Sequence, residues 1–294
     1  MAKRLESSTS DILKKVRRIE LKTKGLSNQI FSGEYQSSFK GRGMAFSEVR
    51  EYAIGDEIRT IDWNVTARFN EPYVKVFEEE RELSVIILVD VSASDNFGTK
   101  DRLKRELIAE LSAIMSFSAI QNNDKIGVIL FSDKVEKFIP PKKGKSHALR
   151  IIKELLEFEP ESKGTDIKIP LEYLNQVTKK RTICFLISDF IADKNYEKAL
   201  KIANKRHDLV ALRVFDEKEK ELPKVGLVHF KNPETGEGQW VNTWSRKTRD
   251  NYKKAFVEQE LELQELMKRS GVDYESIPTD GDYVKPLMNL FKRR

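Results

Sequence analysis

The sequence predicts an α/β fold, in which a doubly wound, mostly parallel sheet follows a β-containing N-terminal extension. From Leu83 onward, continuous runs of Val, Ile and Leu alternate with amphipathic stretches. Such apolar strands are typical of parallel sheets that helices cover on both faces. Between residues 31 and 82, short β-like runs are broken by Gly and Pro instead. We therefore expect two domains, residues 1–82 and residues 83–294, which a chain of 294 residues is long enough to build.

The N-terminal 30 residues predict a basic helical arm. Ile12, Val16 and Ile19 recur at helical spacing, and Gly25 ends the pattern. The segment carries eight Lys or Arg side chains against three Asp or Glu. Such an arm suits nucleic acid or anionic lipid, but a solvated helix face is the interpretation we favour. Aromatic side chains are not interleaved with these bases, so we expect no nucleic-acid partner.

The larger domain reads as an ordered series of strands and helices. Strands are predicted at 85–90, 125–133, 181–190 and 208–216, with a short strand at 134–141 stopped by its prolines. Helices are predicted at 100–120, 166–178 and 196–205. Ser146 is predicted to cap a further helix that follows it. Residues 226–243 predict a hairpin, and a helix from 245 to 269 ends at Gly271. The run at 272–278 predicts a last strand.

Oxygen-bearing side chains follow the strand ends where an open parallel sheet binds ligands. Asp90, Ser92 and Ser94 follow the first strand, Asp189 follows the third, and Thr165 precedes a helix. Carboxylates and hydroxyls are the ligands that Mg²⁺ prefers. The serines could instead form a turn and Asp189 could cap a helix, but the whole set favours a divalent-cation site. An open position on the ion would then bind a carboxylate from elsewhere.

This set resembles the metal-ion-dependent adhesion site of von Willebrand factor type A domains, whose pattern is D-x-S-x-S followed by Thr and Asp. The resemblance implies that Ser92, Ser94 and Thr165 ligate Mg²⁺ or Mn²⁺. It also implies that Asp90 and Asp189 act directly or through water, and that an acidic residue of a partner completes the shell. It implies a von Willebrand factor A-like fold for the larger domain.

The stretches FKGRGMAFSEVREYAIGDEIRTIDWNVTAR (39–68) and YVKVFEEERE (73–82) resemble a bacterial branch, the domain of unknown function 58 family. The resemblance extends over roughly residues 15–290. Members often lie beside a MoxR-type AAA+ ATPase, which implies this ATPase or its substrate as the protein partner. Many members carry N-terminal membrane helices. No run of about 20 apolar residues occurs here, so we expect no membrane span and, without a secretory signal, a cytoplasmic protein.

Five alternating charges stand within the first of these stretches: Arg50, Asp56, Arg59, Asp62 and Arg68. We interpret them as a salt-bridged structural cluster, and a surface for docking a partner is the alternative.

The main enzymatic alternative is a Mg²⁺-dependent phosphohydrolase of the haloacid dehalogenase type. Asp90 would be its nucleophile, and Asp189 with Asp193 would hold the metal. Such an enzyme needs an acid where this chain has Ser92, and a serine hydroxyl is a poor general acid near neutral pH. The chain has no G-x-S-x-G motif, and its three histidines are far apart in the sequence. One of them, His207, follows a helix end, where a cation is favoured. We therefore expect a non-catalytic interaction module.

Overall fold

A computed structural model describes most of the chain. The described residues are 16–20, 23, 45–78, 83–92, 98–99, 102–162, 164–192, 195–231 and 238–293. They form two compact units, a small one made by residues 39–83 and a larger one made by the rest. Residues 16–20 are helical and belong with the larger unit, although the sequence grouped them with residues up to 82. The physical reason is that Val16 and Ile19 are buried and Glu20 forms an ion pair with Lys145 of the larger unit.

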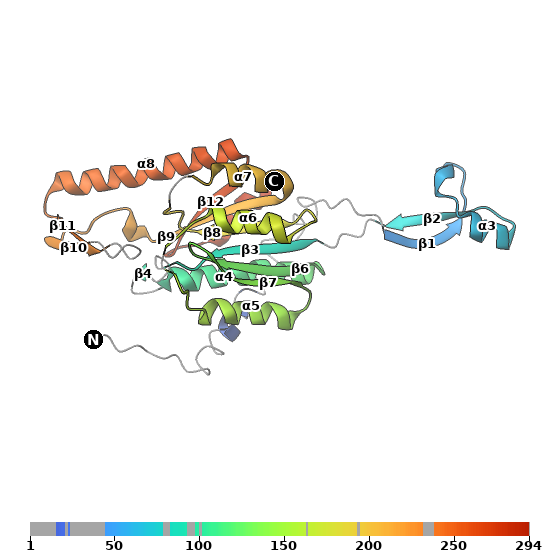
Figure 1. The fold of residues 1–294 in the computed structure, drawn as a ribbon, viewed down its shortest axis with the longest axis horizontal. Helices are drawn as coiled ribbons and strands as arrows, with labels where there is room; N and C mark the ends of the chain where they lie inside the picture. Colours follow the sequence, from blue (N-terminus) through green and yellow to red (C-terminus); the bar gives the residue numbers. More distant parts are fainter. Residues whose placement is uncertain are drawn as a thin grey trace. The chain divides into compact units, whose positions relative to one another are not determined.

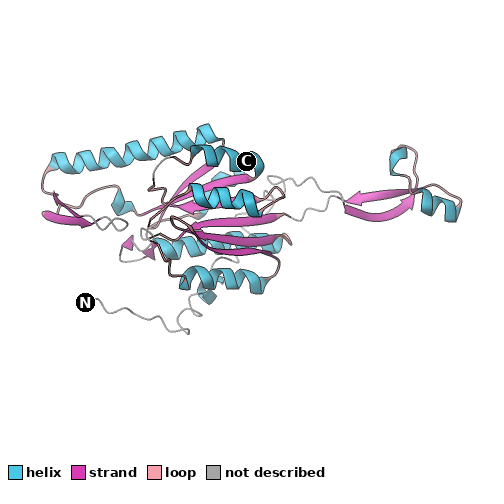
Figure 2. Ribbon diagram, viewed as in Figure 1, coloured by secondary structure: helices cyan, strands magenta, loops and turns pink. Residues whose placement is uncertain are grey.

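The larger unit is built on a six-stranded sheet (Figures 1 and 2) with the strand order β12-β9-β8-β3-β6-β7. The strands are β3 (Ser84–Asp90), β6 (Lys125–Phe131), β7 (Val135–Lys142), β8 (Ile183–Ser188), β9 (Asp208–Phe215) and β12 (Asp273–Pro278). All neighbours pair in parallel except β6 and β7, which are antiparallel. The predicted α/β class with a mostly parallel sheet is therefore confirmed.

Helices cover both faces of this sheet. They are α4 (Lys104–Gln121), α5 (Lys145–Glu157), α6 (Lys168–Val177), α7 (Glu197–Arg206), α8 (Arg246–Ser270) and α9 (Val284–Lys292). In the view of Figure 1, α6 and α4 overlap the strands, whereas α8 runs along the top of the larger unit and α5 along its bottom. Alternate residues of a strand face opposite sides: Cys184 and Leu186 of β8 pack in the core under α6–α8, whereas the ring of Phe185 contacts Phe291 of α9.

The hairpin and the long helix that the sequence predicted are confirmed. Strands β10 (Leu227–Lys231) and β11 (Gly238–Asn242) pair in antiparallel register. The side chain of Ser245 caps α8 by accepting a hydrogen bond from the backbone of Thr248, and Gly271 ends the helix with a φ of 66°. Glycine suits that left-handed position because it has no Cβ.

Three details differ from the sequence predictions. The two prolines near the end of β7 lie within the strand, which tolerates them because β7 is at the edge of the sheet. Helix α5 begins at Lys145 after Gly144, so Ser146 is not its cap. Helix α9 was not predicted, since its nine residues follow a Gly-containing turn and are too few for a periodic signal.

The small unit consists of the antiparallel pair β1 (Ala45–Glu51) and β2 (Tyr73–Glu78), joined through the short helices η1 (Ile58–Thr60) and α3 (Trp63–Phe69). Arg50 donates two hydrogen bonds to the Asp56 carboxylate, at 2.8 and 2.7 Å. Asp62 caps α3 through its side chain and forms an ion pair with Lys75. Part of the charged block therefore has the structural role that we favoured.

Two further short strands, β4 (Gly98–Thr99) and β5 (Arg102–Leu103), precede α4, and the 3-10 helix η3 (Glu217–Glu219) follows β9. Of the helices in the part of the chain described here, none combines the length and the apolar character needed to cross a bilayer.

Candidate functional site

The candidate site lies at the carboxyl ends of β3 and β8, which are neighbours in the centre of the sheet. The two strands pair in parallel, with Leu88 opposite Leu186 and Val89 opposite Ile187. Asp90 is the last residue of β3, and Asp189 directly follows the last residue of β8. The parallel register therefore delivers both carboxyl groups to the same edge, as the sequence predicted.

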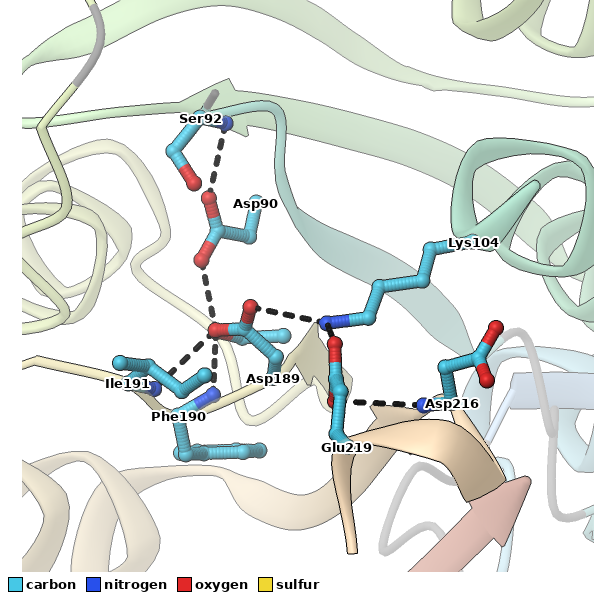
Figure 3. A network of polar contacts seen from close by, with 9 residues as sticks. Asp90, Ser92, Lys104, Asp189, Phe190, Ile191, Asp216 and Glu219 are labelled. Carbon is cyan, nitrogen blue, oxygen red and sulfur yellow. Dashed lines mark hydrogen bonds and ion pairs between the residues drawn. The ribbon is translucent and has the colours of Figure 1, made fainter. Parts of the chain in front are cut away.

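Asp90 is fully buried and both of its carboxylate oxygens accept hydrogen bonds (Figure 3). The backbone N–H of Ser92 donates to Oδ1 at 3.0 Å, and the Ser188 hydroxyl donates to Oδ2 at 2.6 Å. Burial, followed by the nearby charge of Asp189, raises the pKa of Asp90 to about 7, although its hydrogen bonds act in the opposite direction. Burial and the neighbouring Asp189 thus disfavour the charged form of Asp90.

Asp189 is also buried and is held by a tight turn after β8. The backbone N–H of Ile191 donates to its Oδ1 at 3.0 Å, and the N–H of Phe190 donates to the Ser188 hydroxyl oxygen at 3.0 Å. Phe190 adopts a φ of 57°, a left-handed conformation that is uncommon outside glycine. This turn brings two successive backbone donors back toward side chains of the site.

A buried lysine completes the network. Lys104, the first residue of α4, is 1% exposed, and its Nζ lies 3.3 Å from Asp189 Oδ2 and 2.7 Å from Glu219 Oε1. Glu219 ends η3, where its other oxygen accepts the backbone N–H of Asp216 at 3.2 Å in a capping box. One ammonium group therefore joins the end of β8 to the segment after β9.

The structure brings three of the five predicted site residues together: Asp90, Ser92 and Asp189. Ser94 lies outside the described residues, as does Asp193 of the alternative phosphohydrolase site. Thr165 is half-buried in the loop that leads into α6 and is not part of the network in Figure 3. Across the described segments, no group of three or more His, Cys, Asp or Glu side chains is placed to hold a metal ion.

Sequence reasoning missed Ser188, Lys104 and Glu219. Ser188 stands beside Asp189 at a strand end, and Glu219 comes shortly after the end of β9. Applying the strand-end rule to the last residue of β8 and to the segment after β9 would have found both. Lys104 gave no such signal, because a lysine at the start of an amphipathic helix is usually solvated.

The oxygen ligands of Asp90, Ser92 and Asp189 fit a divalent cation that prefers oxygen, such as Mg²⁺ or Mn²⁺. Two carboxylates and a serine hydroxyl are hard ligands, and the Lys104 ammonium shows that Asp189 already accepts a cation in this structure. A small cavity of about 20 Å³ is lined by Asp90, Ser92 and Arg105 together with apolar side chains, and Asp189 is not among its lining residues. It has room for one water-sized species. If the ion binds, Asp90, Ser92 and Asp189 would hold it.

Among solved structures, the chain is similar to the conserved hypothetical protein BatB from Bacteroides thetaiotaomicron. The two are 17% identical with a TM-score of 0.49, and the match covers 72% of this chain and 98% of that one. The VWA domain of SpRpn10 matches with 10% identity and a TM-score of 0.40, over 72% of this chain and 95% of that one.

Sequence comparison finds uncharacterized bacterial relatives. Rv1480 of Mycobacterium tuberculosis is 26% identical over 281 residues, which are 95% of this chain and 88% of the relative. YeaD of Bacillus subtilis is 26% identical over 109 residues, which are 37% of this chain and 25% of the relative. The family model described as protein of unknown function DUF58 matches residues 48–262, which include β3, β8 and the network at their ends. The chain therefore belongs to the DUF58 family.

Proposed function

We propose that this protein is a non-catalytic protein-interaction module of the von Willebrand factor A type. It binds a divalent cation, Mg²⁺ or Mn²⁺, through Asp90, Ser92, Ser94, Thr165 and Asp189. Through that cation it binds an acidic residue of a protein partner. The partner we propose is a MoxR-type AAA+ ATPase or a substrate of that ATPase, and the interaction would serve the assembly or activation of a protein complex.

The observation that supports this proposal best is the pair of buried carboxyls at one edge of the sheet. Asp90 is 0% exposed and Asp189 is 2% exposed. Burying two like charges near each other is unfavourable unless positive charge compensates them, and Lys104 supplies one such charge at Asp189. A divalent ion bound between them would supply further positive charge, and its remaining coordination positions could accept a partner's carboxylate.

The first test is direct binding of Mg²⁺ by isothermal titration calorimetry. The wild type is expected to bind, and Asp90→Ala is expected to lose at least tenfold in affinity because it removes a charged ligand. Asp250→Ala is the matched control, since this carboxylate lies exposed on α8 and pairs only within its own helix with Arg246 among the contacts described. Equal binding by all three proteins would contradict a site at Asp90.

The second test is capture of a MoxR-type AAA+ ATPase from the same organism, with and without EDTA. Capture is expected to need the metal, to fail with Asp90→Ala and to survive Asp250→Ala. Capture that is indifferent to both EDTA and the Asp90 substitution would rule out adhesion through the metal.

The catalytic alternative has its own measurement. A nucleophilic Asp90 would have to reach a phosphate ester, yet this carboxylate is buried and both of its oxygens are engaged by Ser92 and Ser188. We expect no Mg²⁺-dependent phosphatase activity on a general substrate. Turnover that disappears in Asp90→Asn would overturn the non-catalytic proposal.

A further inference from the structure

Lys104 is unexpected beside the proposed cation site, because its ammonium group is itself positively charged and contacts Asp189 of that site. Its side chain is 1% exposed, although a lysine is almost never fully buried unless it is paired. Its ammonium group contacts two carboxylates that come from different strands, Asp189 after β8 and Glu219 after β9. Asp189 is the residue that the proposed divalent ion would share.

The charges of the network explain why the two cations are linked. Among the contacts described, the network includes the carboxyl groups of Asp90, Asp189 and Glu219 and the ammonium of Lys104. A divalent ion bound at Asp90 and Asp189 would lie close to this ammonium in a buried region, where like charges repel strongly. Glu219 offers the ammonium a second partner at 2.7 Å, shorter than the 3.3 Å contact to Asp189.

We infer that Lys104 is an internal competitor of the divalent ion: it compensates Asp189 when the site is empty and shifts toward Glu219 when the ion binds. This inference rests on the proposed metal site and adds what sets its affinity. Glu219 acts as the alternative acceptor that makes metal binding possible without leaving an ammonium unpaired.

Two substitutions with opposite expected effects test it. Lys104→Met keeps the length of the side chain and removes the charge, so Mg²⁺ affinity is expected to rise by about tenfold or more. The same variant is expected to melt at a lower temperature than the wild type in EDTA and to gain more stability from Mg²⁺. Glu219→Gln removes the alternative acceptor, so the ammonium stays at Asp189 and Mg²⁺ affinity is expected to fall.

The control is Lys137→Met, which removes a lysine paired with Glu154 between β7 and α5. Its Mg²⁺ affinity is expected to equal that of the wild type. Calorimetry and thermal melts with Mg²⁺ alone serve as the readouts. If the wild type binds Mg²⁺ and neither Lys104→Met nor Glu219→Gln changes the affinity, Lys104 is only structural and this inference fails alone. If neither the wild type nor any variant binds Mg²⁺, the proposed function fails with it.

Discussion

At the scale of the residue, Asp90 is an acid in surroundings that disfavour its charge. Its pKa is raised to about 7, first by burial and then by Asp189. In the unfolded chain the group titrates near its ordinary value of 3.8. The folded protein therefore holds this proton more tightly than the unfolded chain does. The stability that this gives is fully present below about pH 4 and is lost as the pH rises through about 7.

We expect the wild type in EDTA to lose unfolding free energy, on the order of a few kcal/mol, from this group between about pH 4 and pH 7. Asp90→Asn cannot lose a proton, and its amide can still meet Ser92 and Ser188, so its stability should depend less on pH over that range. Urea unfolding at several pH values measures the difference. If the unfolding free energy of the two proteins changes with pH in the same way, the pKa of Asp90 is not raised in the folded protein.

Residues also mark the limit of what the sequence could predict about the site. Asp90, Ser92 and Asp189 were predictable because they occupy strand ends, whose position follows from the apolar runs before them. The contact between Lys104 and Asp189 was not, since it joins residues 85 positions apart. Only the packing of α4 against the sheet brings them together, and no local pattern encodes that approach.

At the scale of the element, the ends of α6 and α7 are joined by polar contacts around His207. Arg206 donates to the backbone carbonyls of Asn175 and Thr178 at 2.7 and 2.8 Å, which satisfies the last turn of α6. His207 Nε2 lies 3.3 Å from the Thr178 hydroxyl. Burial first, and then the charges of Arg206 and Arg181, lower the pKa of His207 to about 4. The sequence suggested that His207 is a cation, because it follows a helix end. That prediction is wrong, because burial and these two arginines outweigh the helix dipole.

We expect His207 to make the fold sensitive to acid. Its folded pKa lies below the ordinary value of 6.5, so its contribution is fully present above about pH 6.5 and is lost as the pH falls toward 4. The full loss is on the order of 3 kcal/mol. His207→Leu and His207→Asn cannot titrate, and both should flatten the fall in unfolding free energy over this range. A slope that matches the wild type in both variants would contradict the prediction.

Most elements of the larger unit were predictable because each carries its own periodic signal. The exceptions were decided by tertiary context. The prolines at the end of β7 do not stop the strand, because β7 is an edge strand and its pairing with β6 shifts register opposite them, between Ile126 and Val128.

At the scale of the whole molecule, the two units differ in how much apolar surface they bury. The larger unit holds a continuous core under α6, α7 and α8. Among the described side chains of the small unit, Val74 is the buried hydrophobic one, while Ile54, Ile58, Trp63 and Phe69 are exposed. A two-stranded sheet with so little burial is marginally stable by itself.

We therefore expect the units to differ in hydrogen exchange. Amides of β1 and β2 should exchange orders of magnitude faster than those of β3 and β8, because local opening costs little where few apolar contacts are lost. Peptide-level mass spectrometry of the full chain measures both regions at once. Equal protection of the two sheets would mean that the small unit is stabilised by something beyond its own contacts, which would favour the docking alternative for its charged block.

Phe190, which follows Asp189 in a left-handed conformation, has a backbone that favours glycine and a side chain that the core requires. Glycine would adopt the φ of 57° at Phe190 without steric cost. The aromatic ring, however, packs edge-on against Tyr274 at a centroid distance of 6.5 Å and belongs to the core. Replacing it with glycine would relieve the backbone while opening a void beneath the turn and adding chain entropy beside Asp189. The sequence keeps this unfavourable backbone conformation, and the turn that it forms fixes the orientation of the Asp189 carboxylate.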